Sequence, residues 1–186
     1  MVPIVSIVGR SNSGKTTLIE KLIPELNRRG YRVGTIKHHF HSEAALGIDR
    51  EGKDSWRHKK AGAVSVVLSS AKQVALIRDV QGEISLDEAV EKLLGDVDLV
   101  LTEGFKEAHK PKIEVNRKAQ GLPPLCNPAD DLVALVADHN LDLGVPRFGL
   151  DDIAAIAALI EEKFLRPAGG ASVPVCRTDF KSAERG

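Results

Sequence analysis

A glycine-rich stretch near the N-terminus has the residue types and the spacing that bind a phosphate group. Residues 9–16 read Gly-Arg-Ser-Asn-Ser-Gly-Lys-Thr and match the pattern G-x-x-x-x-G-K-[ST] at every fixed position. The glycines let the backbone N–H groups point inward, and the helix that follows adds the positive end of its dipole. Lys15 is expected to reach the β- and γ-phosphates, and the Thr16 hydroxyl to bind Mg²⁺. The predicted nucleotide-binding residues of this loop and of the helix start are Gly9, Ser11, Asn12, Ser13, Gly14, Lys15, Thr16 and Thr17.

A phosphate loop of this kind needs an acid that holds Mg²⁺ from the end of a neighbouring strand. Glu103 follows the apolar run 97–102, so it should emerge at the same edge of the sheet as the loop. We predict Glu103 as a metal ligand and, with Lys15, as a catalytic residue, and the backbone N–H of Gly104 as a phosphate donor. Asp54 is a rival metal ligand, because it stands where a polar loop enters a predicted helix. The alternative for each is an ordinary residue of a turn or loop.

The residues after the second predicted strand also lie where ligands bind in such sheets. Lys37 could meet a phosphate or an acidic substrate there, or be a surface lysine. His38, His39 and His41 follow at once and could bind a transition metal, although no cysteine accompanies them. The sequence therefore keeps a dedicated metal site open as a minor alternative.

The base of a nucleotide needs a separate recognition site. Asp138 follows an apolar strand predicted over 132–137, and its carboxylate could accept hydrogen bonds from the guanine N1 and N2 groups. The Asn-Lys-x-Asp signature of many GTPases is absent, since residues 137–140 read Ala-Asp-His-Asn. Asp138 could equally do no more than end its strand.

The apolar pattern predicts an α/β fold that would position these residues. Residues 3–8 read as a buried strand, apolar residues then repeat at helical spacing, and 32–37 read as a second strand in a right-handed βαβ unit. Two short strands, 64–68 and 74–77, read as a hairpin, so part of the sheet should be antiparallel. We predict a three-layer P-loop NTPase fold, with a mostly parallel sheet, an antiparallel hairpin and helices on both faces. The other predicted elements are strands 97–102, 112–116 and 132–137, helices 55–61 and 86–94, a last helix ending near 164, and a surface loop at 118–131.

Length and composition favour one soluble globular domain. The chain has 186 residues, of which 42% are hydrophobic and 28% charged. We expect residues 1–165 to form one nucleotide-binding domain, and 166–186, rich in Pro, Gly, Ala and Ser, to be a flexible tail. Acidic and basic residues balance at 26 each, so no overall field argues for binding to nucleic acid or to a membrane.

The cysteines and the N-terminus favour a cytoplasmic location. Cys126 and Cys176 lie far apart and form neither a C-x-x-C pair nor a disulfide framework, which is typical of a reducing compartment. No apolar run approaches the length of a membrane span. A strand begins almost at the first residue, which leaves no room for a signal peptide.

Several short motifs together resemble one protein family. They are Gly-Arg-Ser-Asn-Ser-Gly-Lys-Thr-Thr at 9–17, Ile-Lys-His-His at 36–39, Gly-Lys-Asp-Ser at 52–55, Ala-Gly-Ala at 61–63 and Thr-Glu-Gly-Phe-Lys at 102–106. This set resembles the molybdopterin-guanine dinucleotide biosynthesis protein B (MobB) family over about residues 2–165. The phosphate loop alone would not choose the family, whereas the motifs at 52–55 and 103–106 make the match specific.

The resemblance implies a GTP-binding protein that forms homodimers and hydrolyses GTP weakly. Such proteins are adaptors for the guanylyltransferase partner that attaches GMP to molybdopterin, which makes molybdopterin a further candidate ligand. Carried over by position, Gly14, Lys15, Thr16 and Thr17 would hold phosphate and Mg²⁺. Glu103 and Gly104 would form a second motif on the phosphate side.

Two other functions remain open from the sequence. A small-molecule P-loop kinase would need an acceptor base and a lid rich in arginine, and no clear lid segment is present. A metal-insertion GTPase would use the histidines at 38, 39 and 41 to carry the metal. Phosphate transfer to an added acceptor would indicate the kinase, and tight stoichiometric Ni²⁺ or Zn²⁺ binding would indicate the metal carrier.

Overall fold

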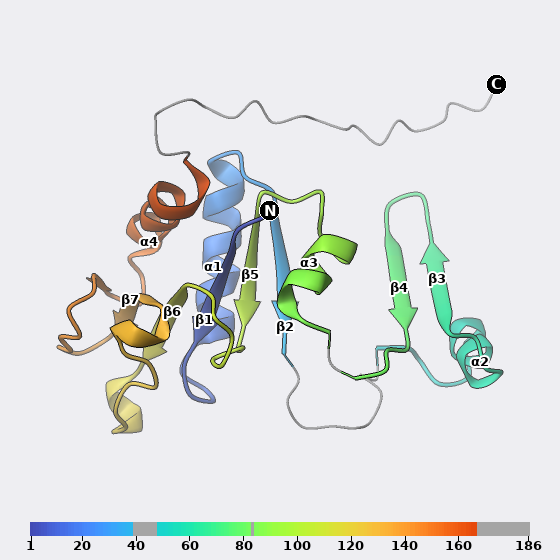
Figure 1. Ribbon diagram of the computed structural model, residues 1–186, viewed down its shortest axis with the longest axis horizontal. Helices are drawn as coiled ribbons and strands as arrows, with labels where there is room; N and C mark the ends of the chain where they lie inside the picture. The colour runs from blue at the N-terminus through green and yellow to red at the C-terminus, as the bar shows by residue number, and fades with distance from the viewer. Residues whose placement is uncertain (39–47, 83, 167–186) are drawn as a thin grey trace. The chain divides into compact units, whose positions relative to one another are not determined.

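The computed structural model describes residues 1–38, 48–82 and 84–166, and the chain divides into two compact units. The first unit contains residues 1–36 and those from 96 onward, and the second contains residues 37–95. Figure 1 shows the elements of both units along the chain. Each unit is described by itself below.

The first unit is built on a six-stranded sheet with the order β2-β5-β1-β6-β7-β8. The central strand β1 pairs in parallel with β5 on one side and with β6 on the other, and β6–β7 and β7–β8 are parallel too. All carboxyl ends of these five strands therefore meet at one edge. The strands are β1 (Ile4–Val8), β2 (Val33–Lys37), β5 (Leu99–Glu103), β6 (Lys112–Asn116), β7 (Leu132–Ala137) and β8 (Arg147–Phe148).

One face of this sheet packs against two helices that contact each other, α1 (Lys15–Arg28) and α4 (Ile153–Ile160). A π-helical turn, η3 (Glu161–Leu165), continues α4, so the predicted last helix changes its geometry before it ends. Every second strand residue points to these helices, as the two-residue period of a strand requires. The fully buried members of this core include Val5, Ile7, Leu22, Leu26, Leu99, Leu101, Ile113, Ala134, Val136, Ile156 and Ile160.

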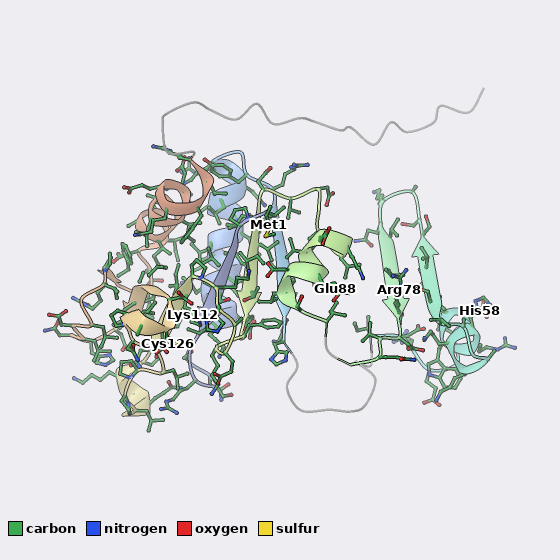
Figure 2. The ribbon with its side chains drawn as sticks, viewed as in Figure 1. Met1, His58, Arg78, Glu88, Lys112 and Cys126 are labelled. Atoms are coloured by element: carbon green, nitrogen blue, oxygen red, sulfur yellow. The ribbon has the colours of Figure 1, made fainter. Side chains whose placement is uncertain are left out.

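The opposite face of β6 is polar and buried. The Glu114 carboxylate accepts hydrogen bonds from the backbone N–H groups of Leu125 (2.8 Å) and Cys126 (2.9 Å). Lys112 lies on the same face and donates to three carbonyl oxygens, those of Ala108, Lys110 and Asp130. Figure 2 shows Lys112 and Cys126 close together. The predicted loop at 118–131, which contains the short 3₁₀ turns η1 (Lys118–Gln120) and η2 (Pro128–Asp130), is therefore anchored to the sheet.

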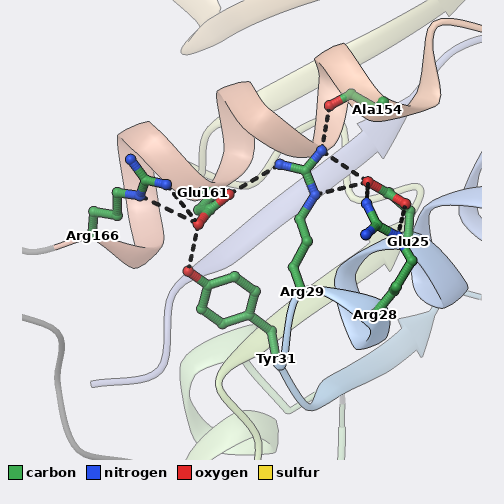
Figure 3. Close-up of polar contacts among 7 residues, drawn as sticks. All are labelled: Glu25, Arg28, Arg29, Tyr31, Ala154, Glu161 and Arg166. Carbon is green, nitrogen blue, oxygen red and sulfur yellow. Dashed lines mark hydrogen bonds and ion pairs between the residues drawn. The ribbon is translucent and has the colours of Figure 1, made fainter.

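The end of α1 is joined to the end of α4 by a polar network (Figure 3). The Glu161 carboxylate accepts from Arg29 (3.0 Å), from the Tyr31 hydroxyl (3.0 Å) and from Arg166 (3.0 Å). Burial alone would raise the pKa of Glu161, but these hydrogen bonds hold that pKa below its ordinary value. Arg29 also binds Glu25 on its own helix. The network fixes the last described turn of the chain against α1.

The second unit contains a short helix, an antiparallel hairpin and a second helix. These are α2 (Asp54–Lys60), β3 (Ser65–Ser69), β4 (Val74–Arg78) and α3 (Leu86–Leu93), and the Ser85 hydroxyl caps α3 by accepting from the Glu88 N–H. The hairpin was predicted correctly, but it forms a two-stranded sheet of its own. The expectation that it would add antiparallel strands to the main sheet was wrong. Among the described residues, none of the helices has the length and apolar character needed to cross a bilayer.

Candidate phosphate-binding site

The loop between β1 and α1 has the backbone of a phosphate-binding turn. Gly9 and Gly14 have φ angles of 142° and 101°, and Asn12 has φ of 60°, which are left-handed conformations that favour glycine. The Arg10 carbonyl accepts from the Ser13 N–H at 3.2 Å and closes the turn. The first α-helical hydrogen bond, from the Leu18 N–H to the Gly14 carbonyl, follows at once at 2.9 Å. The predicted strand–loop–helix context is confirmed.

Gly9 is required by packing as well as by its backbone conformation. A Cβ atom at this position would collide with the Val115 carbonyl oxygen of β6 and lie 2.7 Å from the Ser13 Oγ atom. The start of the loop is therefore pressed against the neighbouring strand. Only a residue without a side chain fits there.

The Lys15 ammonium group lies inside the loop. Its Nζ atom donates to the carbonyl oxygens of Gly9 (3.1 Å) and Arg10 (2.8 Å). Those bonds hold a positive charge beside the N-terminus of α1, where the helix dipole is also positive. The two features together make this the most favourable place in the loop for a phosphate.

Thr16 and Glu103, which are 87 residues apart in the sequence, meet at the mouth of the loop. The Thr16 Oγ1 atom donates to the Glu103 Oε2 atom at 2.9 Å. Glu103 ends β5, and it lies next to Ile7 in the pairing of β5 with β1. A hydroxyl and a carboxylate so arranged are hard oxygen donors of the kind that Mg²⁺ prefers. The structure thus brings two of the three predicted metal ligands, Thr16 and Glu103, together.

Gly104 follows Glu103 with φ of 99°. Its N–H group donates to the Ile7 carbonyl at 3.0 Å, which extends the pairing of β5 with β1 by one bond. The predicted contact between this N–H group and a phosphate stays a prediction. Among the other loop residues, the side chain of Ser13 is buried, whereas Ser11, Asn12 and Thr17 are exposed.

Asp138 lies at the same edge of the sheet, directly after β7. Its carboxylate accepts from the Lys118 N–H (2.7 Å) and from the Arg117 Nε atom (3.0 Å), and the His139 ring lies at 3.3 Å. The backbone N–H of Lys118, with help from His139 and Arg117, holds the pKa of Asp138 below its ordinary value. Asp138 is therefore a carboxylate at neutral pH, as a guanine acceptor must be, and its contact with guanine stays a prediction.

Sequence reasoning missed two residues beside the loop. Arg117 follows β6 directly and pairs with Asp138, and the Gln120 Nε2 atom donates to the Ser11 carbonyl at 2.7 Å. Their position directly after a predicted strand could have indicated them, because residues that follow a parallel strand emerge at the edge of the sheet where ligands bind.

The chain resembles known proteins of one family. The family model described as "MobB: Molybdopterin guanine dinucleotide synthesis protein B" matches residues 4–138. The chain belongs to the MobB family. Two relatives are named molybdopterin-guanine dinucleotide biosynthesis adapter protein. The one from Haemophilus influenzae is 38% identical, over 86% of this chain and 88% of its own. The one from Escherichia coli is 35% identical, over 87% and 93%.

The fold is shared with solved MobB structures. A crystal structure of molybdopterin-guanine biosynthesis protein B aligns with a TM-score of 0.66 at 35% identity, over 86% of this chain and 97% of that one. A Bacillus subtilis MobB structure aligns with a TM-score of 0.68 at 28% identity, over 86% and 97%. The predicted three-layer P-loop NTPase fold is confirmed, and so is the resemblance to the MobB family.

Several predicted residues of this MobB-family chain lie outside the first unit or outside the described residues. Lys37 ends β2, and Asp54 opens α2 of the second unit, so their roles at the phosphate site stay predictions. His39 and His41 lie outside the described residues. Within the described ranges, no group of three histidine, cysteine or acidic side chains could hold a metal ion.

Proposed function

We propose that this protein binds GTP with Mg²⁺ and serves as an accessory protein in the synthesis of the guanine dinucleotide form of the molybdenum cofactor. The observation that carries the proposal is the 2.9 Å contact between Thr16 and Glu103 at the mouth of a complete phosphate loop. Membership of the MobB family and the printed names of the two adapter-protein relatives support the biosynthetic role. The acid Glu103, at the mouth of the loop, distinguishes this site from a glycine turn that merely precedes a helix.

The residues of the site divide the work of holding a triphosphate. Lys15 exchanges its bonds to the loop carbonyls for bonds to the β- and γ-phosphate oxygens. Thr16 and Glu103 hold Mg²⁺, directly or through its water ligands. When bound, Mg²⁺ supplies positive charge that neutralises the phosphate oxygens. The left-handed backbone at Gly9 and Gly14 lets the loop wrap the phosphates.

We expect GTP hydrolysis to be slow. Gln120, the glutamine beside the loop, uses its amide to bind the Ser11 carbonyl, so it is not arranged to orient an attacking water. A slow enzyme would keep GTP bound long enough to act as a delivery or switch protein.

The proposed partners follow from the same role. We propose that the protein acts as a homodimer in the cytoplasm and assists a guanylyltransferase that joins GMP to molybdopterin. Molybdopterin itself is a further candidate ligand. Neither a nucleic acid nor a membrane is part of the proposal.

Competition binding tests the nucleotide part. GTP and ATP compete for the purified protein in the presence of Mg²⁺, and phosphate release is followed in the same samples. We expect a strong preference for GTP and very slow release. Lys15→Ala should raise the Kd for GTP about a hundredfold, or about 2.7 kcal/mol, without unfolding the domain. Lys21→Ala removes a lysine of the same helix that binds Asp151, and should leave the Kd unchanged.

Either of two outcomes would contradict this part of the proposal. Unchanged GTP affinity in Lys15→Ala would show that residues 9–16 do not bind the phosphates of GTP. Preference for ATP with rapid phosphate transfer to an added acceptor would indicate a kinase instead.

Reconstitution tests the accessory role. The guanylyltransferase, molybdopterin and GTP are mixed with and without this protein, and the guanine dinucleotide product is measured by mass spectrometry. We expect the wild-type chain to raise the yield and Lys15→Ala to raise it less. Equal yields with and without the chain would show that it does not assist this reaction.

A further inference from the structure

The segment after β6 forms a second wall beside the phosphate loop. The Gln120 amide donates to the Ser11 carbonyl at 2.7 Å, which ties η1 to the tip of the loop. The Arg117 Nη1 atom lies 3.8 Å from the position that a Cβ atom would take on Gly14. The guanidinium therefore lies next to the first residue of the loop-to-helix turn.

Arg117 is held in this place by an acid. Its Nε atom donates to Asp138 Oδ2 at 3.0 Å, and Asp138 is itself fixed by the Lys118 N–H at 2.7 Å. A guanidinium is planar and stacks well on flat rings. With one edge bound to Asp138, the plane of the Arg117 side chain is restricted before any ligand arrives.

The order of the strands indicates which way a bound nucleotide would run along the edge of the sheet. β5 and β6 flank β1 on opposite sides. Thr16 and Glu103 lie on the β5 side, so the metal and the terminal phosphates belong there. Arg117 and Asp138 follow β6 and β7 on the other side. We therefore expect a nucleotide whose phosphates fill the loop to extend its nucleoside toward Arg117 and Asp138.

A buried side chain at the same edge has an unused acceptor. Asn116 is the last residue of β6 and is only 4% exposed. Its Oδ1 atom is buried and accepts no hydrogen bond within the described residues. Buried polar atoms are almost always paired, so an unused one immediately before Arg117 is consistent with a ligand at this place.

We propose that Arg117 is a base-binding residue that lies against the face of the purine base, with its plane set by Asp138, and that the base binds beyond the carboxyl ends of β6 and β7. This inference rests on the proposed nucleotide binding. It assigns the base end of the site to residues outside the sequence motifs of the phosphate loop.

The test separates the base from the phosphates. The Kd values of GTP and of inorganic tripolyphosphate, each with Mg²⁺, are measured for the wild-type protein and for Arg117→Ala. We expect the variant to lose roughly tenfold or more in GTP affinity, equivalent to about 1.4 kcal/mol, and to keep its tripolyphosphate affinity. Retained tripolyphosphate binding also shows that the variant is folded. Lys118→Ala, which removes an exposed neighbouring charge, is the matched control and should change neither value.

Three results would overturn the inference, and a fourth would overturn the proposed function on which it rests. Equal losses for GTP and tripolyphosphate in Arg117→Ala would make Arg117 a phosphate contact. Full recovery of GTP affinity in Arg117→Lys would show that charge alone is needed, because lysine lacks the planar group. A wild-type protein that binds neither ligand would overturn the proposed function itself, and a protein that binds tripolyphosphate and GTP equally would overturn only the base site.

Discussion

Glu103 is a glutamate where phosphate-loop proteins usually place an aspartate, and its longer side chain is used fully here. The carboxylate reaches across from β5 to the Thr16 hydroxyl at 2.9 Å. The register that sets Glu103 beside Ile7 places its Cα one strand away from the phosphate loop. The added methylene therefore lets the acid span the distance between strand and loop.

Loss of the Glu103 charge should weaken Mg²⁺ binding and so shift the Mg²⁺ dependence of GTP binding to higher Mg²⁺ concentrations. A neutral amide is a poorer Mg²⁺ ligand than a carboxylate, so Glu103→Gln should require roughly ten times more Mg²⁺ to reach half of its maximal GTP affinity. Mg²⁺ titrations at fixed GTP measure this shift. Glu107→Gln, which changes an exposed acid four residues later, is the control. An unchanged Mg²⁺ dependence in Glu103→Gln would exclude the residue from the metal site.

A comparison of Gly9 with Gly30 separates two effects of a glycine substitution on stability, namely backbone strain and steric clash. Both have positive φ angles, 142° and 94°, but a Cβ atom on Gly30 meets nothing within 4 Å, whereas on Gly9 it collides with Val115. We expect Gly30→Ala to cost roughly 1 kcal/mol of folding free energy and Gly9→Ala roughly 3 kcal/mol. Urea denaturation measures both values. Similar costs in the two variants would mean that the contact with Val115 is easily relieved.

At the scale of elements, α1 and α3 begin in opposite ways. The Ser85 side chain caps α3, and two acids, Asp87 and Glu88, occupy its first turn. α1 starts after Gly14 with no side-chain cap and no acid in its first turn. A helix start of this kind suits a bound phosphate.

Most strands and helices could be predicted from local pattern, but the two-residue strand β8 and the short turns η1 and η2 could not. Most contacts between distant segments could not be predicted either. The phosphate loop was predictable because all of its fixed residues lie within eight positions, and Glu103 because it ends an apolar run. The role of Arg117 was missed because it depends on the hydrogen bond to Asp138 and on closeness to Gly14, neither of which can be read from sequence spacing. The hairpin was predicted, but its separation from the main sheet was not, because a strand pattern does not say which strand is its neighbour.

The network around Glu161 should stabilise the contact between α1 and α4. Glu161 accepts from Arg29, Tyr31 and Arg166 and is only 15% exposed. Glu161→Gln weakens these charge-assisted bonds, so we expect a loss of roughly 1–2 kcal/mol in the free energy of unfolding at pH 7. Denaturant unfolding measures the loss. Glu162→Gln, at the exposed neighbouring position, should change stability little.

The same network predicts the direction of a pH effect. The pKa of Glu161 in the folded chain lies below its ordinary value of 4.5. A lowered pKa means that the stabilisation is complete above pH 4.5 and is lost as the pH falls through the folded value. The difference between wild type and Glu161→Gln should therefore shrink below pH 4.5. A difference independent of pH would show that packing, and not charge, causes it.

At the scale of the molecule, the two units differ in how well they bury apolar side chains. The first unit has a well-packed core, whereas the hairpin of the second unit exposes several apolar side chains. One face of the hairpin carries Val67, Val74 and Leu76, since Val67 pairs directly with Leu76 and Val74 lies two residues before Leu76. These side chains are 59%, 69% and 41% exposed. A two-stranded sheet is marginally stable alone, and three neighbouring apolar side chains on one face are a feature of association surfaces.

This face is where we place the contact of the proposed homodimer. A two-fold dimer uses the same patch on both subunits, so the face that carries Val67, Val74 and Leu76 would meet its own copy. We expect the wild-type protein to sediment with twice its chain mass of 20.1 kDa and Val67→Asp to sediment as a monomer, because the buried charge would have no partner. Leu122→Asp changes a similarly exposed leucine of the first unit and should leave the dimer intact. If Val67→Asp still forms a dimer, the subunits must contact each other through another surface. If the wild-type protein is a monomer, the proposed homodimer is wrong.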